Sequence, residues 1–480
     1  MDYVLLAGIY ALEITSGILI FGLFKKGDQP LSVFLSTTSG RVFLFGLIVW
    51  AISVAIIVFE YMRSRRGGFV GFRMTTVLGV TPVVIIVLTV ELSIRLLSTS
   101  SMYGEMFLGL HLRPRIWEDQ VARNREILKR MSSDGSYLQY DDYLGWSIGA
   151  NRRSVDGMYL SSAEGVRSPT VNMSMLTQES RGRIALIGDS FTFGEEVKFE
   201  ETWGYFLQQY VGDERQVLNY GVPGYGLDQA YLRYLRDVRP LHPDIMVIGL
   251  ISHDIERTMT VYNFISFPEW EFPFAKPRFS FSNGDLAILN SPVPSPEAIT
   301  KWSSIGQLPF LEYDRGYHES EWDSTKLDCS YLFRFLTSKF PRWPVRNAEV
   351  SDRVQITLNS EILLKLISVA REDGTLPMVV YFPTHGTFVR MSSEMTRQEL
   401  AIDVLEYSRV EYSDLTSCLM QVDDSERFVP SKRHYSPEAN MYVAKCIAED
   451  IADMESIELT RSGRNTLVND RITANPNTYI

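Results

Sequence analysis

The sequence predicts an α/β protein, a flavodoxin-like three-layer α/β/α sandwich with a parallel sheet, preceded by N-terminal transmembrane helices. Apolar runs typical of buried strands lie at residues 183–187, 216–222 and 243–251. Stretches with helical spacing of apolar residues alternate with these runs, and this alternation favours a parallel sheet covered by helices on both faces. The first hundred residues show a different pattern, because long apolar runs replace the short ones there.

A membrane module is predicted at residues 1–100. Its three apolar runs, each about 20 residues long and able to cross about 30 Å of hydrocarbon as a helix, cover residues 3–24, 42–61 and 75–97. More basic residues lie between the second and third runs than between the first and second. Because basic loops stay in the cytoplasm, we expect a multi-pass membrane protein whose C-terminal domain is extracytoplasmic. A cleaved signal peptide is the alternative for the first run, but no basic segment precedes that run.

A connector and prelude are predicted at residues 101–180. The stretch at 113–130 is basic and polar, which predicts a helix that leaves the membrane surface, and Trp146 is expected to pack in a core. The main domain follows at residues 181–455. Amphipathic spacing predicts its helices at residues 203–210, 227–239, 353–370 and 436–454. The tail at 456–480 has no apolar periodicity and is predicted to be disordered.

An insertion interrupts the alternation of strands and helices at residues 257–346. It is rich in aromatic residues and proline, and alternating residues around Asn283 and Gly284 predict a β-hairpin. The insertion leaves the sheet directly after a strand, so we expect it to form a lid or one wall of a substrate cleft. A packing subdomain remote from substrate is the alternative, since aromatic side chains stack on sugar rings but also build small cores.

A candidate nucleophile lies at the turn between the first buried strand and the next helix. Gly188, Asp189 and Ser190 follow the strand directly. The carboxyl ends of parallel strands form a crevice, and the amides of the following helix point their positive end into it. Serine is a poor nucleophile unless an imidazole removes its proton. Ser190 therefore needs a histidine partner, and Asp189 is expected to cap the turn.

Four segments in this order resemble the sequence blocks of the SGNH (GDSL-like) hydrolases, of the membrane-anchored bacterial type. They lie at residues 188–194, 219–226, 252–254 and 433–440, and the resemblance covers roughly residues 140–455. It implies that Ser190 is the nucleophile and His434 its general base. It also implies an oxyanion hole made by the backbone N–H groups of Ser190 and Gly224, where glycine lets the amide face a substrate.

The chain departs from the family pattern at two positions. The family carries an asparagine as third oxyanion donor where this chain has His253, whose imidazole can also donate one N–H. The family's aspartate before the catalytic histidine is missing as well. A Ser-His dyad is one outcome, and a carboxylate from the preceding loop that orients His434 is the other; the candidates are Asp414, Asp423 and Asp424. Asp254 and Arg257, three residues apart, predict a surface pair or a helix cap.

The resemblance implies a serine esterase that forms an acyl-enzyme. We expect it to act on ester groups, above all O-acetyl groups, of an extracytoplasmic glycan or lipid. An O-acyltransferase that uses the same residues is one alternative, and a catalytically impaired carbohydrate-binding or assembly component is another. The expected partners are the membrane, a small-molecule or polysaccharide ester, and proteins of envelope or polysaccharide assembly. No cofactor is expected.

Composition excludes other classes of function. The net charge of −11 argues against nucleic acid as a partner, because binding to phosphates needs a basic surface. The histidines outside the four blocks have no metal-ligand spacing, so no metal is expected. The three cysteines have no paired spacing and predict no disulfide framework, although a single bond is compatible with a site outside the cell.

Overall fold

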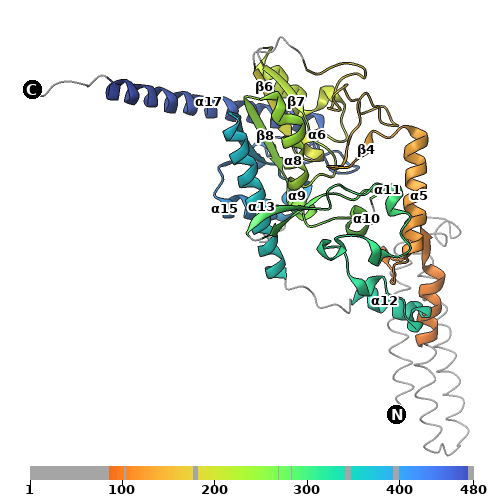
Figure 1. The fold of residues 1–480 in the computed structure, drawn as a ribbon. Coiled ribbons are helices and arrows are strands. Elements are labelled where there is room, and N and C mark those ends of the chain that lie inside the picture. The colour runs from red at the N-terminus through yellow and green to blue at the C-terminus, as the bar shows by residue number, and fades with distance from the viewer. Residues whose placement is uncertain are drawn as a thin grey trace, which may run out of the picture. The chain divides into compact units, whose positions relative to one another are not determined.

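The computed structural model describes residues 86–473, apart from 102–103, 177–181, 214, 269, 283, 341–347 and 393–398. These residues form two compact units (Figure 1). The first contains the described part of residues 1–120 together with 318–344, and the second contains residues 121–317 and those from 345 onward. The second unit carries the main sheet.

A five-stranded parallel sheet lies at the centre of the second unit, with the strand order β12-β11-β8-β6-β7. Its strands are β6 (Gly182–Ile187), β7 (Arg215–Asn219), β8 (Ile245–Leu250), β11 (Leu376–Tyr381) and β12 (Tyr412–Asp414). Every residue of β8 is buried, as expected for a central strand covered on both faces. The register pairs Ile187 with Ile248, so β6 and β8 end at the same edge of the sheet.

Helices cover both faces of this sheet, which confirms the predicted sandwich for the second unit. Ala185 and Ile187 of β6 belong to one apolar core, while Ile184 and Leu186 belong to the other. This division follows from the alternation of side chains along a strand. The first core is closed by α8 (Leu227–Arg233), α9 (Ser252–Arg257), α13 (Ala348–Glu372) and α15 (Leu400–Ser408), and the second by α7 (Trp203–Val211), α16 (Thr416–Leu419) and α17 (Pro437–Thr473).

The shorter elements complete the second unit. The prelude is a hairpin whose Trp146 is fully buried, as expected of a packing residue. Besides the hairpin of the insertion described below, the remaining helices and strands here are α5 (Trp117–Asp134), which begins in the first unit, β4 (Leu138–Asp141), β5 (Gly145–Ile148), α6 (Ser190–Phe193), α10 (Asn263–Ser266), α11 (Pro296–Ile299) and α14 (His385–Ser392). A π-helical turn (Tyr234–Val238) continues α8, and short 3₁₀ turns lie at Phe199–Glu201, Arg239–Leu241, Ile305–Gln307 and Leu311–Tyr313.

The predictions for the insertion and for the C-terminal tail have different outcomes. The predicted hairpin of the insertion is confirmed, because β9 (Arg278–Ser282) pairs antiparallel with β10 (Asp285–Leu289). The predicted disorder of the tail is wrong over most of its length, since α17 continues to Thr473. A helix extends cheaply once its first turns exist, and the packed turns of α17 at Val443 and Ile447 supply that start.

Two cysteines are joined, although their spacing gave no sign of it. Cys418 of α16 forms a disulfide with Cys446 of α17, 28 residues later. Cys329 is a free, exposed thiol. The disulfide joins α17 to α16, the helix that precedes the histidine block.

The first unit contains a helix over residues 86–97, the strands β1 (Thr99–Ser101), β2 (Gly104–Phe107) and β3 (Leu110–His111), 3₁₀ turns at Glu319–Glu321 and Lys326–Cys329, and α12 (Tyr331–Lys339). Leu88, Leu92 and Leu96 are each more than half exposed on the helix. No helix within the described residues is long and apolar enough to span a membrane. The first two predicted spans, and the third as far as residue 85, lie outside the described residues.

Candidate active site

The strand-to-helix turn after β6 places Ser190 at the first position of α6. Gly188 has φ +152°, and a Cβ there would lie 2.2 Å from Thr192 Oγ1 and 2.9 Å from the Gly249 carbonyl oxygen, so only glycine fits. Asp189 caps the helix as predicted, because its carboxylate accepts a hydrogen bond from the Phe191 amide at 2.9 Å. As the first helical residue, Ser190 has a backbone N–H with no partner inside the helix.

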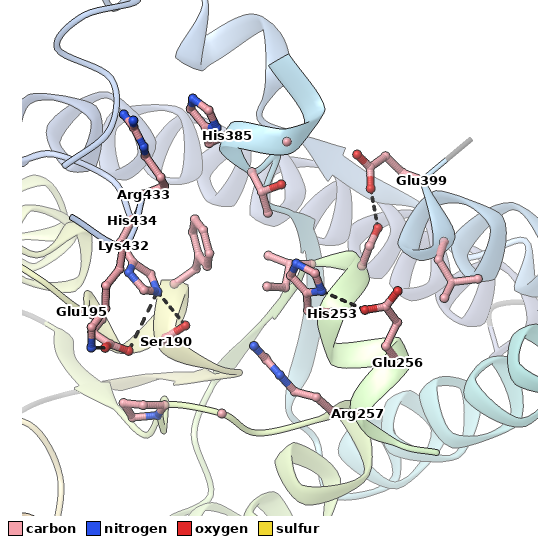
Figure 2. Close-up of a pocket in the computed structure, with 18 of the residues that line it drawn as sticks. Ser190, Glu195, His253, Glu256, Arg257, His385, Glu399, Lys432, Arg433 and His434 are labelled. Carbon is pink, nitrogen blue, oxygen red and sulfur yellow. Dashed lines mark hydrogen bonds and ion pairs between the residues drawn. The ribbon is translucent and has the colours of Figure 1, made fainter. Parts of the chain in front are cut away.

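The structure brings Ser190 and His434 together from positions 244 residues apart. His434 Nε2 lies 2.9 Å from Ser190 Oγ (Figure 2). The histidine lies just before α17, and its ring packs 4.9 Å from the ring of Phe191. Its side chain is only 12% exposed. Nucleophile and base are therefore within hydrogen-bond reach, and the base is largely buried.

Glu196 supplies the carboxylate that orients this imidazole. Its Oε2 lies 3.0 Å from His434 Nδ1. With the Nδ1 proton donated to Glu196, Nε2 carries the lone pair that accepts the Ser190 hydroxyl proton. The three groups form a Ser-His-Glu relay, so the structure favours a triad over the Ser-His dyad.

None of the three aspartates predicted for this role contacts His434 in the hydrogen bonds that the structure shows, and Glu196 takes their place. Asp424 pairs with Arg427 at 2.8 Å, and its side chain is 93% exposed. Asp414 accepts a hydrogen bond from the Thr416 amide at 2.9 Å, as a helix cap does. Asp423 is exposed. Asp414 and Asp424 thus pair with groups two or three residues away in the chain, and closeness in sequence to His434 misled the prediction.

Glu196 is held in place by more than the imidazole. Its carboxylate also accepts hydrogen bonds from the Ser431 hydroxyl and from the amides of Lys432, at 2.9 Å, and His434, at 3.0 Å. Burial alone would raise the pKa of Glu196, but these hydrogen bonds outweigh it and lower the pKa below the ordinary value of 4.5. The residue has φ +72°, a strained conformation for any residue but glycine.

A second glutamate lies beside the relay. Glu195 Oε2 is 3.8 Å from His434 Nε2, and Glu195 Oε1 is 2.7 Å from Lys432 Nζ. The Glu195 side chain is 13% exposed and lines the same cavity as Ser190. Both glutamates lie just after the C-cap of α6, and this acidic pair five and six residues after the nucleophile is the signal in the sequence that could have identified them.

A buried network of ion pairs joins the turn that carries the nucleophile to α9. Arg257 Nη1 lies 2.9 Å from Asp189 and 2.8 Å from Asp254, and none of the three side chains is more than 7% exposed. Of the two expected roles of Asp254 and Arg257, the surface pair is wrong, because both side chains are buried and Arg257 also pairs with Asp189. The helix cap is confirmed for Asp254, whose carboxylate accepts a hydrogen bond from the Ile251 amide at the start of α9 at 3.0 Å. Burial, and then the charge of Asp189, raises the pKa of Asp254 well above its ordinary value.

The predicted oxyanion donors differ in their placement. Gly224 has φ +82° and lines the cavity together with Ser190. His253 also lines it, but its ring is 62% exposed and Nδ1 lies 2.8 Å from Glu256 Oε2. Figure 2 shows His253 across the cavity from Ser190 and His434. The donor role of His253 stays a prediction that this arrangement does not favour, whereas Ser190 and Gly224 remain suited to theirs.

The cavity has a volume of about 950 Å³ and is walled partly by the insertion. Trp270 and Phe272 contribute aromatic surface, and His385 lies across the cavity from Glu195 (Figure 2). This position of Trp270 and Phe272 agrees with the expected cleft wall. In the part of the chain that the structure describes, no group of three His, Cys, Asp or Glu side chains is arranged to hold a metal ion.

Comparison with known proteins gives likeness at the level of solved structures. No family model and no curated protein matches the chain. A lipolytic protein of the G-D-S-L family from Desulfitobacterium hafniense is 14% identical, with a TM-score of 0.29, and covers 56% of this chain and 98% of its own. The acetylxylan esterase Axe2 from Geobacillus stearothermophilus is 11% identical, with a TM-score of 0.29, and the match covers 57% of this chain and 94% of Axe2. The structure of TesA is 11% identical, with a TM-score of 0.29, and the match covers 55% of this chain and 97% of TesA. Values this low do not assign the chain to a family, so its chemistry follows from its own site.

Proposed function

We propose that this protein is a serine esterase of the SGNH type that acts on ester groups, above all O-acetyl groups, of an extracytoplasmic glycan or lipid. The observation that carries the proposal is the relay in which His434 lies 2.9 Å from Ser190 Oγ and 3.0 Å from Glu196. A carbohydrate-binding component without catalysis has no need of such a relay. With Glu196 in the place of the family's aspartate, the main support for that alternative is lost.

The proposed reaction has two halves. Ser190 Oγ attacks the carbonyl carbon of the ester while His434 Nε2 takes the hydroxyl proton, and Glu196 stabilises the imidazolium that forms. The N–H groups of Ser190 and Gly224 stabilise the oxyanion, at about 3 to 4 kcal/mol for each donor. Collapse breaks the bond to the alcohol, which leaves with the proton from Nε2. A second hydroxyl then attacks the acyl-enzyme by the same route in reverse.

The proposed substrate follows from the walls of the cavity. Trp270 and Phe272 offer flat apolar surface beside Gly224, at 3.7 and 3.9 Å from the place where a Cβ at 224 would lie. Aromatic faces of this kind suit the apolar faces of sugar rings. Hydrolysis and transfer to a sugar hydroxyl share every residue of the relay and differ only in the acceptor, so an O-acyltransferase remains the second candidate.

The proposed location outside the cytoplasm has two supports. Disulfides persist in oxidising compartments, and Cys418 is bonded to Cys446. The exposed Leu88, Leu92 and Leu96 continue the third apolar run of the sequence, as residues leaving a bilayer would. A multi-pass anchor that holds the main domain at the outer or periplasmic face is consistent with both.

A fluorophosphonate probe tests the proposed chemistry. We expect the full chain, purified in detergent, to be labelled, and Ser190→Ala to lose the label while keeping the thermal unfolding midpoint. A panel of acetylated glycans then tests the substrate, with acetate release measured for the wild type and for His434→Ala. Absence of labelling in a folded wild type would refute the esterase, and labelling without acetate release from any glycan would refute an acetylated glycan as the substrate.

A further inference from the structure

Glu195 has no part in the relay, yet it lies at the point where the second half-reaction takes place. Its Oε2 is 3.8 Å from His434 Nε2, the nitrogen that must accept a proton from the attacking hydroxyl (Figure 2). This separation is too long for a direct hydrogen bond. It is the kind of separation that a bridging oxygen fills, because an atom about 2.9 Å from each partner spans it.

Lys432 fixes which oxygen of Glu195 faces the imidazole. Lys432 Nζ lies 2.7 Å from Glu195 Oε1, so Oε2 is the atom directed to Nε2. Burial alone would lower the pKa of Lys432, but the Glu195 carboxylate outweighs it and raises the pKa. The lysine therefore stays charged at neutral pH and holds the carboxylate in place, with Oε1 on the ammonium group and Oε2 on the side of His434.

We propose that Glu195 selects water as the acyl acceptor, so that the site hydrolyses its acyl-enzyme instead of transferring the acyl group to an alcohol. This inference rests on the proposed function and decides between its two forms. A carboxylate only accepts hydrogen bonds. Water has two O–H groups and satisfies both Nε2 and Glu195, whereas an alcohol has a single O–H, which Nε2 requires. An alcohol oxygen in the same place meets the Glu195 anion with lone pairs only.

The step is balanced in atoms and protons. The water oxygen bonds to the acyl carbon, one of its protons passes to His434 Nε2, and the other stays hydrogen-bonded to Glu195. Collapse of the tetrahedral intermediate breaks the bond between the acyl carbon and Ser190 Oγ. His434 returns its proton to Oγ, and the carboxylic acid leaves. Glu195 is unchanged throughout, and its contribution is to position the attacking oxygen.

The ratio of two products tests this role. The full chain is given p-nitrophenyl acetate in water that contains methanol, and acetate and methyl acetate are both quantified. In Glu195→Gln, the amide oxygen can keep the bond to Lys432 and turn its NH₂ toward the acceptor, where it donates to an alcohol lone pair. Loss of a hydrogen bond to a charged group slows hydrolysis about tenfold. We expect the ratio of methyl acetate to acetate to rise about tenfold.

The controls separate this inference from the proposed function. The product ratio does not depend on the amount of folded enzyme, so partial misfolding of Glu195→Gln leaves the test valid, and Glu195→Ala gives a second reading of it. Glu200→Gln changes an exposed glutamate five residues away and should leave the ratio unchanged. An unchanged ratio in the Glu195 variants would overturn the inference while the esterase stands. No Ser190-dependent release of p-nitrophenol in the wild type would overturn both.

Discussion

His434 Nδ1 lies 3.0 Å from Glu196 Oε2, and the same carboxylate accepts the backbone N–H of His434 at 3.0 Å. The glutamate thus binds both the ring and the main chain of the residue that it orients. Because Glu196 lies only six residues after Ser190, the nucleophile and the orienting acid belong to the same short segment of the chain. Only the base, His434, comes from a segment that is distant in the sequence.

Replacing Glu196 by glutamine should abolish most of the turnover without weakening binding. An amide that presents its NH₂ to His434 Nδ1 favours the wrong tautomer, in which Nε2 is protonated and cannot accept the proton of Ser190. Loss of this function in serine hydrolases lowers kcat by about 10⁴. Steady-state kinetics with p-nitrophenyl acetate measures it. An equal loss in the exposed Glu200→Gln control, or a change confined to KM, would contradict the role.

The stability that Glu196 supplies should depend on pH in a defined window. Its pKa in the folded protein is lowered from 4.5, so folding favours the ionised form. The stabilisation is then fully present above pH 4.5 and is lost as the pH falls through the lower folded value. Thermal unfolding of the wild type and Glu196→Gln should therefore show a gap in midpoint at neutral pH that closes in acid. A difference in midpoint that widens in acid would contradict a lowered pKa of Glu196 in the folded protein.

Removing Arg257 should destabilise the fold strongly. Its guanidinium is the cation that the buried carboxylates of Asp189 and Asp254 share. Breaking a buried ion pair from one side costs about 3 to 5 kcal/mol, so Arg257→Ala should lower the free energy of unfolding by that amount in urea titrations. Arg239→Ala breaks a pair with Asp373 at the surface and should change it little. Similar effects of the two substitutions would show that the network is not structural.

The disulfide should stabilise the segment that presents His434. Cys418 and Cys446 close a loop of 28 residues, and a cross-link of this length contributes about 3 to 4 kcal/mol. The double substitution to serine should lower the free energy of unfolding by that amount, and reducing agent should do the same to the wild type. Cys329→Ser is the matched control and should have no effect. Insensitivity of the wild type to reductant would contradict the bond.

The sheet and the nucleophile could be predicted because their signals in the sequence are local. Each residue of β8 is buried, so the strand reads as an unbroken apolar run. Ser190 follows such a run at the edge where ligands bind. His434 was predictable only through the family resemblance, because the residues around it carry no signal that its side chain contacts Ser190.

The features that were mispredicted depend on contacts between distant segments. Glu196 adopts φ +72° outside any periodic element, and its function appears only when the loop of Ser431 and His434 folds against it. Asp254 and Arg257 have the spacing of a surface pair, and Asp189 from another strand end is what draws Arg257 inward. Charge spacing within one helix cannot report such a partner.

Trapping the acyl-enzyme is the most direct test of the account. The full chain is mixed with p-nitrophenyl acetate, quenched in acid within one turnover and digested, and the peptide that contains Ser190 is examined by mass spectrometry. We expect an acetyl group on Ser190 in the wild type, and far less in His434→Ala. A folded wild type with no acetyl group on Ser190, or equal acetylation in the two proteins, would contradict the proposed nucleophile and base.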